Sequence, residues 1–85
     1  MKVRYDSDVD ALYVPLRPET PVSRSAVVDA NRVVDLDASG EAVGIEVLGA
    51  SQGLRLSDLT DRYGLGTFSE ALLEVETAAR HPKQH

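Results

Sequence analysis

Apolar and polar residues alternate along two neighbouring stretches of the chain, RVVDLD and VGIEVL. In the first, Val34 and Leu36 share one side of an extended chain, and in the second Val43, Ile45 and Val47 do the same. A period of two residues is typical of a β-strand with one buried face. The sequence therefore predicts two strands with apolar side chains on one face and acidic side chains on the other.

The residues between these strands, DASGE, predict a tight turn, because glycine readily adopts the positive φ that short hairpin loops require. Pairing Val34 with Ile45 and Leu36 with Val43 places all the apolar side chains together. A slip of one residue, which a bulge at Gly40 would produce, sets acidic against apolar positions. We expect the first of these two registers.

Three further strands are predicted upstream. Residues 2–6 and the run ALYVPL form a hairpin around an acidic turn, with Pro15 near the end of its strand because proline cannot donate a ladder hydrogen bond. Residues 17–21, RPETP, predict a loop. A third strand follows around Val27 and Val28.

The pattern becomes helical after residue 52. Ser57 is a plausible N-cap of a short helix that stops at Gly64, and Thr67 with Glu70 has the spacing of a capping box. The second helix ends before Pro82. Four apolar residues recur on one of its faces: Phe68, Leu72, Val75 and Ala79.

The predicted fold class is α+β: a small antiparallel sheet of about five strands, in a meander of hairpins, followed by one short and one longer C-terminal helix. Residues 1–80 form a single domain, with the sheet in residues 1–50 and a helical extension in residues 54–80. We expect residues 81–85 to form a disordered tail.

Composition narrows the classes of function. The 85 residues contain 14 acidic and nine basic side chains, a net charge of −5, and no cysteine. The sequence contains no cluster of Lys and Arg that could contact a phosphate backbone, so direct nucleic-acid binding is disfavoured. The N-terminus reaches charged residues before any apolar run, so we expect no signal peptide, no membrane segment and a cytoplasmic location. A chain this short buries little surface, which favours a homodimer or another protein partner.

The acidic hairpin is the strongest candidate for chemistry. Its spacing, D-x-D-x-S-G-x5-E, fits the calcium loop of an EF-hand. An EF-hand loop needs flanking helices, whereas these residues lie in predicted strands, so we expect the carboxylates to face solvent. The alternative is a small-ligand or divalent-cation site built from Asp35, Asp37 and Glu46, with Glu41 beside them.

Other catalytic and cofactor patterns are weak. Both histidines, His81 and His85, lie in the predicted tail, and no phosphate-binding or zinc-protease motif occurs. We expect no enzyme activity, no catalytic residue and no cofactor.

Aromatic and apolar residues mark candidate interface positions. Tyr5 and Tyr13 lie in the first hairpin, where they could stack across strands, and together they would form an interface if exposed. Phe68, Leu72 and Val75 on the second helix could lie against the sheet or a partner.

The chain resembles a bacterial family catalogued as domain of unknown function 2283. The segments that carry the resemblance are YD at Tyr5, DALY ending at Tyr13, DLD beginning at Asp35, Gly40, and VGIEVL ending at Leu48. The resemblance implies an antiparallel β-domain, often with a helical C-terminus and without established catalytic residues. Some members look like the antitoxin halves of toxin–antitoxin pairs. This chain departs from the shortest members by its helices after residue 52.

Two hypotheses of function follow. The first is a non-enzymatic protein-interaction module, an antitoxin-like partner of a basic toxin, since an acidic surface attracts a basic protein. The second is the ligand-binding or cation-binding domain at the acidic hairpin. A hydrolase that uses paired carboxylates is a remote third, because it would need a cleft.

Overall fold

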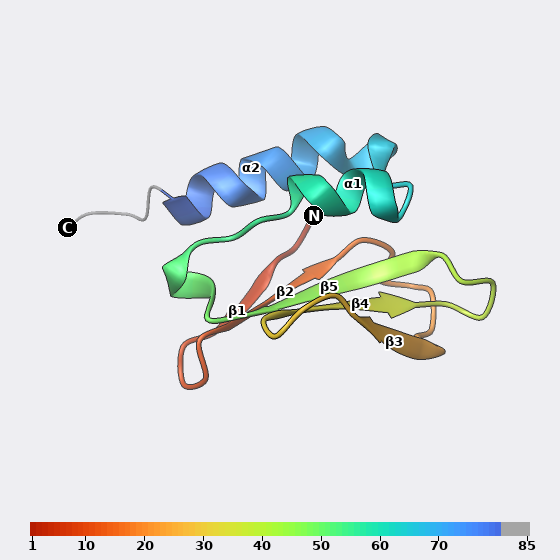
Figure 1. Ribbon diagram of the computed structural model, residues 1–85, viewed down its shortest axis with the longest axis horizontal. Helices are drawn as coiled ribbons and strands as arrows, with labels where there is room; N and C mark the ends of the chain where they lie inside the picture. Colours follow the sequence, from red (N-terminus) through yellow and green to blue (C-terminus); the bar gives the residue numbers. More distant parts are fainter. Residues whose placement is uncertain (81–85) are drawn as a thin grey trace.

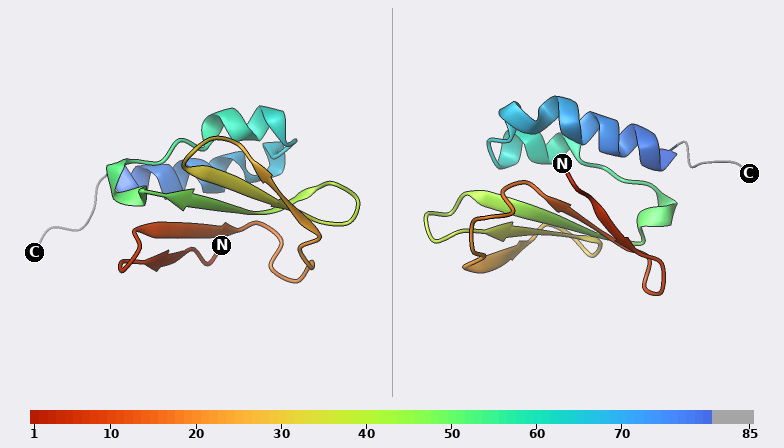
Figure 2. Two further views of the ribbon diagram at one scale, coloured as in Figure 1. Left: turned by 60° about the horizontal axis from the view of Figure 1, so that its bottom comes forward. Right: turned by 180° about the vertical axis from the view of Figure 1, so that it is seen from behind.

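A five-stranded antiparallel sheet forms one layer and the helices form a second layer across one of its faces (Figures 1 and 2). The computed structural model describes residues 1–80. The strands are β1 (Arg4–Asp6), β2 (Ala11–Pro15), β3 (Arg24–Val27), β4 (Arg32–Leu36) and β5 (Ala42–Leu48). The helical elements are the 3-10 turn η1 (Ala50–Gln52), α1 (Ser57–Arg62), the 3-10 turn η2 (Gly66–Phe68) and α2 (Ser69–Arg80). The predicted α+β class is confirmed.

The strand order is β1-β2-β5-β4-β3, so the sheet is not the simple meander that the sequence suggested. After Pro15 ends β2, the proline-containing loop of residues 16–23 carries the chain across to the far edge, where β3 begins. Strands β4 and β5 then return toward the centre, and β5 pairs with β2. Proline cannot donate a ladder hydrogen bond, which explains why β2 ends at Pro15.

The register of the β4–β5 hairpin is the predicted one in its centre and differs at its end. Val34 pairs with Ile45, as predicted. Leu36 pairs with Ala42 and not with Val43, because a β-bulge leaves Val43 as an extra residue on β5. A bulge redirects the side chain of the extra residue. Val43 is buried, but it lies outside the core cluster that contains Ile45, so its predicted place on the core face is wrong.

The core lies between the sheet and the helices. Fourteen buried apolar residues form it: Leu12, Val14, Leu16, Val34, Leu36, Ala42, Ile45, Val47, Ala50, Leu54, Leu56, Leu59, Leu65 and Leu72. The apolar face predicted for the second helix is confirmed, since Phe68, Val75 and Ala79 also pack against this cluster. Helix α2 therefore covers the sheet of its own chain, which a small domain needs in order to bury a core.

Both predicted helix starts are displaced by one or two residues. Ser57 is the first residue of α1, while Leu56 occupies the N-cap position without a side-chain cap. Thr67 lies inside η2 rather than before α2, so it is not the N-cap of a capping box. The α1 start has another acceptor: the buried carboxylate of Glu76, on α2, accepts a 3.3 Å hydrogen bond from the Leu56 N–H.

A buried arginine joins the sheet to the helical layer. Arg32 on β4 is only 5% exposed, on the same face as Val34. Its Nη1 donates to Asp58 on α1 at 2.7 Å and to the carbonyl oxygen of Arg55 at 2.6 Å, while Nε and Nη2 both donate to Asp29. A buried guanidinium needs such acceptors to offset its lost hydration. Arg32 thereby fixes α1 over β4.

No helix among residues 1–80 is long and apolar enough to cross a membrane. The disordered tail predicted for residues 81–85 lies outside the described residues.

Candidate interaction face

The face of the sheet opposite the helices, here called the outer face, has no helix across it (Figure 1). Because paired residues share a face and alternate along each strand, the register identifies its members. One rung crosses all five strands and consists of Arg4, Tyr13, Glu46, Val33 and Val27. The next rung consists of Pro15, Gly44, Asp35 and Ser25. The face is thus a mixture of apolar, aromatic and charged side chains.

A hydrogen-bonded chain fixes the middle of the outer face. The hydroxyl of Tyr13 on β2 donates to Asp35 Oδ2 on β4 at 2.9 Å, and Ser25 Oγ on β3 donates to Asp35 Oδ1 at 2.6 Å. The Tyr13 side chain reaches Asp35 by crossing β5 at Gly44. A Cβ atom at position 44 would overlap the hydroxyl oxygen and Cζ of Tyr13, so only glycine leaves room for the ring.

The charge state of Tyr13 follows from this environment. Burial against the strand, together with the hydrogen bond to Asp35 and the negative charge of that residue, raises the pKa of Tyr13 to about 12. The guanidinium of Arg4 acts in the opposite direction from 5.3 Å above the ring. Tyr13 is therefore a neutral hydrogen-bond donor at physiological pH, held in one position on the outer face.

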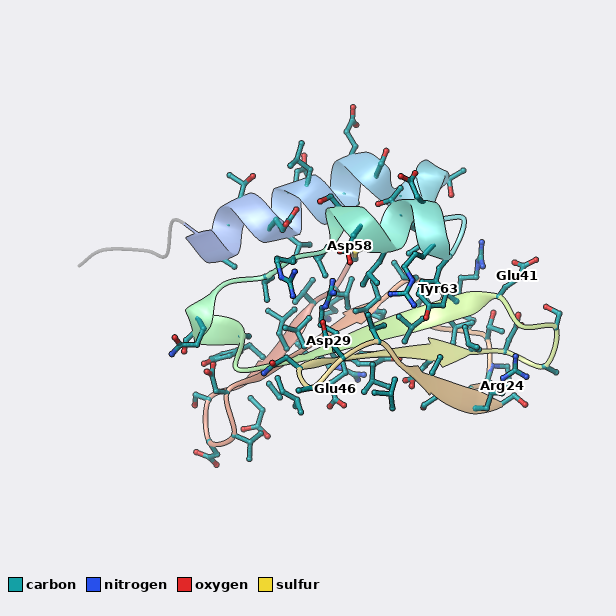
Figure 3. All side chains as sticks on the ribbon, viewed as in Figure 1. Arg24, Asp29, Glu41, Glu46, Asp58 and Tyr63 are labelled. Carbon is teal, nitrogen blue, oxygen red and sulfur yellow. The ribbon has the colours of Figure 1, made fainter. Side chains whose placement is uncertain are left out.

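Glu46 occupies the centre of the five-strand rung. It lies on β5 between Tyr13 and Val33 and projects from the side of the sheet away from the helices (Figure 3). Glu46 is half-buried as a residue, and within residues 1–80 its carboxylate takes part in none of the ion pairs or side-chain hydrogen bonds. At the end of the same rung, Val27 is 74% exposed. Tyr13 and Val33 flank Glu46 on the rung, and Arg4 lies beyond Tyr13. A carboxylate without an ion pair is an attractive site for a cation from another molecule.

The other carboxylates of the acidic hairpin have separate roles. Asp37 Oδ1 accepts hydrogen bonds from the N–H and Oγ of Ser39 and from the N–H of Glu41, and these bonds lower the pKa of Asp37. Glu41 forms a 3.0 Å ion pair with Arg17. Asp37 thus shapes the turn, while Glu41 holds the neighbouring loop.

The alternative, a cation site built from Asp35, Asp37 and Glu46, is not assembled in this geometry. Asp35 is engaged by Tyr13 and Ser25 on the sheet, Asp37 by its own turn, and Glu46 lies on the neighbouring strand. Within residues 1–80, no three His, Cys, Asp or Glu side chains are grouped so that they could hold a metal ion. The arrangement therefore gives the cation hypothesis no support from geometry.

The five candidate interface residues lie in different places. Tyr13 is half-buried on the outer face, whereas Tyr5 pairs with Leu12 and so belongs to the opposite side of the sheet. The two tyrosines therefore do not stack across the strands as the sequence suggested. Tyr5 is paired with the residue next to Tyr13, and neighbouring positions along a strand point to opposite faces of the sheet. The hydroxyl of Tyr5 instead donates to Asp10, which raises the pKa of Tyr5.

The three candidates on or next to α2 face the core of their own chain. Leu72 is only 1% exposed, and Phe68 and Val75 are half-buried against the sheet. Phe68 also lies beneath the guanidinium of Arg17, at 5.5 Å. These three side chains are therefore occupied by contacts within their own chain, whereas the outer face has no helix packed across it.

Sequence reasoning missed the Tyr13–Asp35 pair and the role of Gly44. One signal was present: a glycine in the interior of a predicted strand often marks the close approach of another group. The partner of that glycine could not be named, because Tyr13 and Gly44 become neighbours only when β5 inserts beside β2.

These features define a small two-layer α+β protein whose sheet has one covered face and one exposed, internally braced face. The chain belongs to the family described as Protein of unknown function (DUF2283), whose model matches residues 2–51, more than half of the chain. The matched segment contains all five strands and ends before α1, so both α-helices lie outside it. No curated protein and no solved structure matches the chain.

Proposed function

We propose that this chain is a non-enzymatic protein-interaction module whose outer face binds a basic protein, as an antitoxin covers its toxin. The observation that carries the proposal is Glu46, a half-buried carboxylate at the centre of the outer face with no cationic partner among residues 1–80. A lysine or arginine from a partner would form the ion pair that Glu46 lacks within residues 1–80.

The surroundings of Glu46 suit a protein surface better than a small ligand. Tyr13 and Val33 flank the carboxylate, and Val27 extends the apolar surface to the sheet edge. Interfaces characteristically combine a rigid aromatic residue with apolar neighbours around a few charged contacts. The hydrogen bond to Asp35 already orders Tyr13, so binding would cost little side-chain entropy there.

The charge of the chain favours a basic partner. A net charge of −5 on 85 residues attracts a positively charged protein over several ångströms and increases its association rate. This attraction weakens as salt is added, because the Debye length at physiological ionic strength is about 8 Å. Affinity for the partner should accordingly fall with increasing salt.

Co-expression with the product of the adjacent gene tests the proposal. The tagged chain would be purified as wild type, as Glu46→Lys and as Glu70→Lys, where Glu70 is an exposed residue at the start of α2. Both variants change the net charge equally, so they separate a local contact from general attraction. The proposal predicts a complex with wild type and Glu70→Lys that Glu46→Lys loses.

Three results would contradict the proposal: no complex with wild type, equal loss in both variants, or loss in Glu70→Lys alone. Size-exclusion chromatography of the isolated chain tests whether a second copy of the chain, rather than a basic protein, binds the outer face. A homodimer that Glu46→Lys dissociates would assign the outer face to self-association and would overturn the basic-partner proposal.

A further inference from the structure

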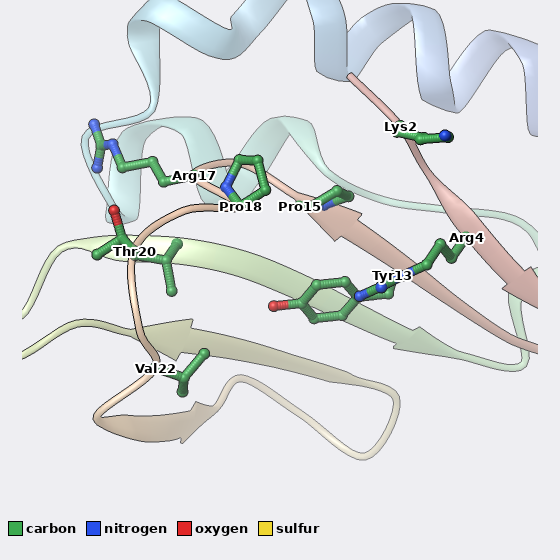
Figure 4. Close-up of a pocket in the computed structure, with 9 residues that line it drawn as sticks. Lys2, Arg4, Tyr13, Pro15, Arg17, Pro18, Thr20 and Val22 are labelled. Atoms are coloured by element: carbon green, nitrogen blue, oxygen red, sulfur yellow. The ribbon is translucent and has the colours of Figure 1, made fainter.

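A groove of about 350 Å³ opens on part of the outer face, between the N-terminal segment and the loop that follows β2 (Figure 4). Tyr13 lies in the middle of it, between Arg4 on one side and Val22 on the other. Pro15 and Val43 supply further apolar wall. The bulge in β5 is the reason that Val43 reaches this groove and not the core.

Positive charge is concentrated at one end of the groove. Lys2 and Arg4 both line it, and neither forms an ion pair with an acidic residue among residues 1–80. Arg17 also lines the groove, but its guanidinium is paired with Glu41. The Arg4 guanidinium lies over the Tyr13 ring at 5.3 Å, so Arg4 and Lys2 place two positive charges beside an apolar wall, neither with an ion pair in the described part of the chain.

The floor of the groove is preorganised. The hydroxyl of Tyr13 is held by Asp35, and Gly44 allows the ring to lie close to β5. The loop wall is fixed as well, because Arg17 Nη1 donates to Glu41 and to the carbonyl oxygen of Ala42. A binding site whose walls are already ordered loses little entropy when a ligand enters.

We propose that this groove binds a small organic anion: an anionic head contacts Arg4 and Lys2, and an apolar body packs against Pro15, Val22 and Val43. The volume is near the lower end of the range for ligand pockets, about 300 to 1,000 Å³, so the body is no larger than one ring or a short branched chain. Carboxylate and phosphate heads both suit a guanidinium. The groove shares Arg4, Tyr13 and Pro15 with the outer face, but the inference does not rest on the proposed function.

Two probes test the inference, benzoate and phenyl phosphate, added to the ¹⁵N-labelled full chain and followed by NMR. Saturable shifts of the Tyr13, Val22 and Val43 amides are expected, with a dissociation constant on the order of 1 mM or tighter. Benzyl alcohol keeps the ring without the charge, and acetate or inorganic phosphate keeps the charge without the ring. Each of these controls should bind at least tenfold more weakly.

A charge-removing variant locates the anionic head. Lys2→Gln combined with Arg4→Gln should weaken the tighter probe by at least tenfold. Arg24→Gln removes an exposed arginine of β3, outside the groove, and should leave binding unchanged. The dispersion of the NMR spectrum verifies that each variant is folded.

Binding of either probe with this pattern supports the inference. It is overturned if neither probe saturates, if the shifts occur elsewhere, if the neutral or ring-free controls bind as well, or if the Lys2 and Arg4 substitutions leave binding unchanged.

Discussion

Gly44→Ala is the substitution that most sharply tests how the outer face is built. Gly44 lies in β5, and the Tyr13 side chain crosses it to reach Asp35. An added Cβ would collide with the hydroxyl oxygen and Cζ of Tyr13, which lie at the constrained end of a ring and not on a flexible chain. The ring must therefore move, and the hydrogen bond to Asp35 is lost.

The expected loss of stability follows from three contributions. Overpacking a well-packed site costs about 1–3 kcal/mol. Loss of the Tyr13–Asp35 hydrogen bond costs about 1 kcal/mol, since both side chains are only partly buried. Replacing glycine by alanine regains about 0.4–1 kcal/mol by restricting the unfolded chain. Gly44→Ala should thus lower the free energy of unfolding by about 2 kcal/mol.

Urea unfolding followed by circular dichroism measures this loss, with Gly66→Ala as the matched control. No heavy atom lies within 4 Å of a Cβ built at Gly66, whose φ is not in the left-handed region, so that substitution should be neutral or slightly stabilising. In a Tyr13→Val background the obstruction is gone, and Gly44→Ala should then cost little. If Gly44→Ala behaves like Gly66→Ala, or if its cost persists without Tyr13, the inferred packing is refuted.

Two further predictions concern charged groups. The pKa of Tyr13 is raised to about 12, above the ordinary value near 10, so its contribution to stability is present below pH 10 and is lost as pH rises through about 12. Absorbance at 295 nm should show a tyrosine titration near pH 12, and Asp35→Asn should shift that titration toward pH 10. Arg32→Met should destabilise the fold by about 2–4 kcal/mol in urea unfolding, because it removes the buried partner of Asp58, whereas Arg24→Met, on an exposed arginine, should change stability by no more than about 0.5 kcal/mol.

The dependence of stability on acidic pH is an independent test of the hydrogen bonds from Arg32 to Asp29 and Asp58. The hydrogen bond from Arg32 is the largest cause of the lowered pKa of Asp58 and of Asp29. Their contribution to stability is present above the ordinary aspartate pKa and is lost as pH falls through the lowered values. Arg32→Met should therefore flatten the acidic part of the stability profile. An unchanged profile would show that these carboxylates gain nothing from Arg32.

Local patterns in the sequence were enough to predict the strands, the hairpins and the amphipathic helix. The alternation around Val34 and Ile45 identified the core face, and the spacing of Phe68, Leu72 and Val75 identified the face of α2 that packs on the sheet. These predictions succeed because burial imposes a period of two on a strand and of 3.6 on a helix.

The errors arise where contacts join distant parts of the chain. The strand order depends on which strand pairs with β5, and no local pattern in the sequence predicts that pairing. At the bulge, the carbonyl oxygen of Val43 accepts hydrogen bonds from the N–H groups of Leu16 and Arg17, a contact that the hairpin's own sequence does not reveal. The burial of Arg32 likewise depends on a distant contact, because Asp58 on α1 accepts its hydrogen bond.

The candidate site was predicted only in part for the same reason. The sequence singled out Asp35 and Glu46 as outward-facing carboxylates, and both lie on the outer face. It did not distinguish them: Asp35 is engaged by Tyr13 and Ser25, while Glu46 has no such partner within residues 1–80. That difference, which motivates the proposed function, depends on the three-dimensional register of four strands.

The central claim is that the outer face, with Glu46 at its centre, is the surface that binds a partner. Cross-saturation NMR on the complex of the labelled chain with the co-expressed partner tests this claim most directly. The account predicts that saturation from the partner reaches Val27, Val33 and Glu46 and spares the exposed residues Glu70 and Leu73 of α2. Transfer to α2, with none to the outer face, would contradict it.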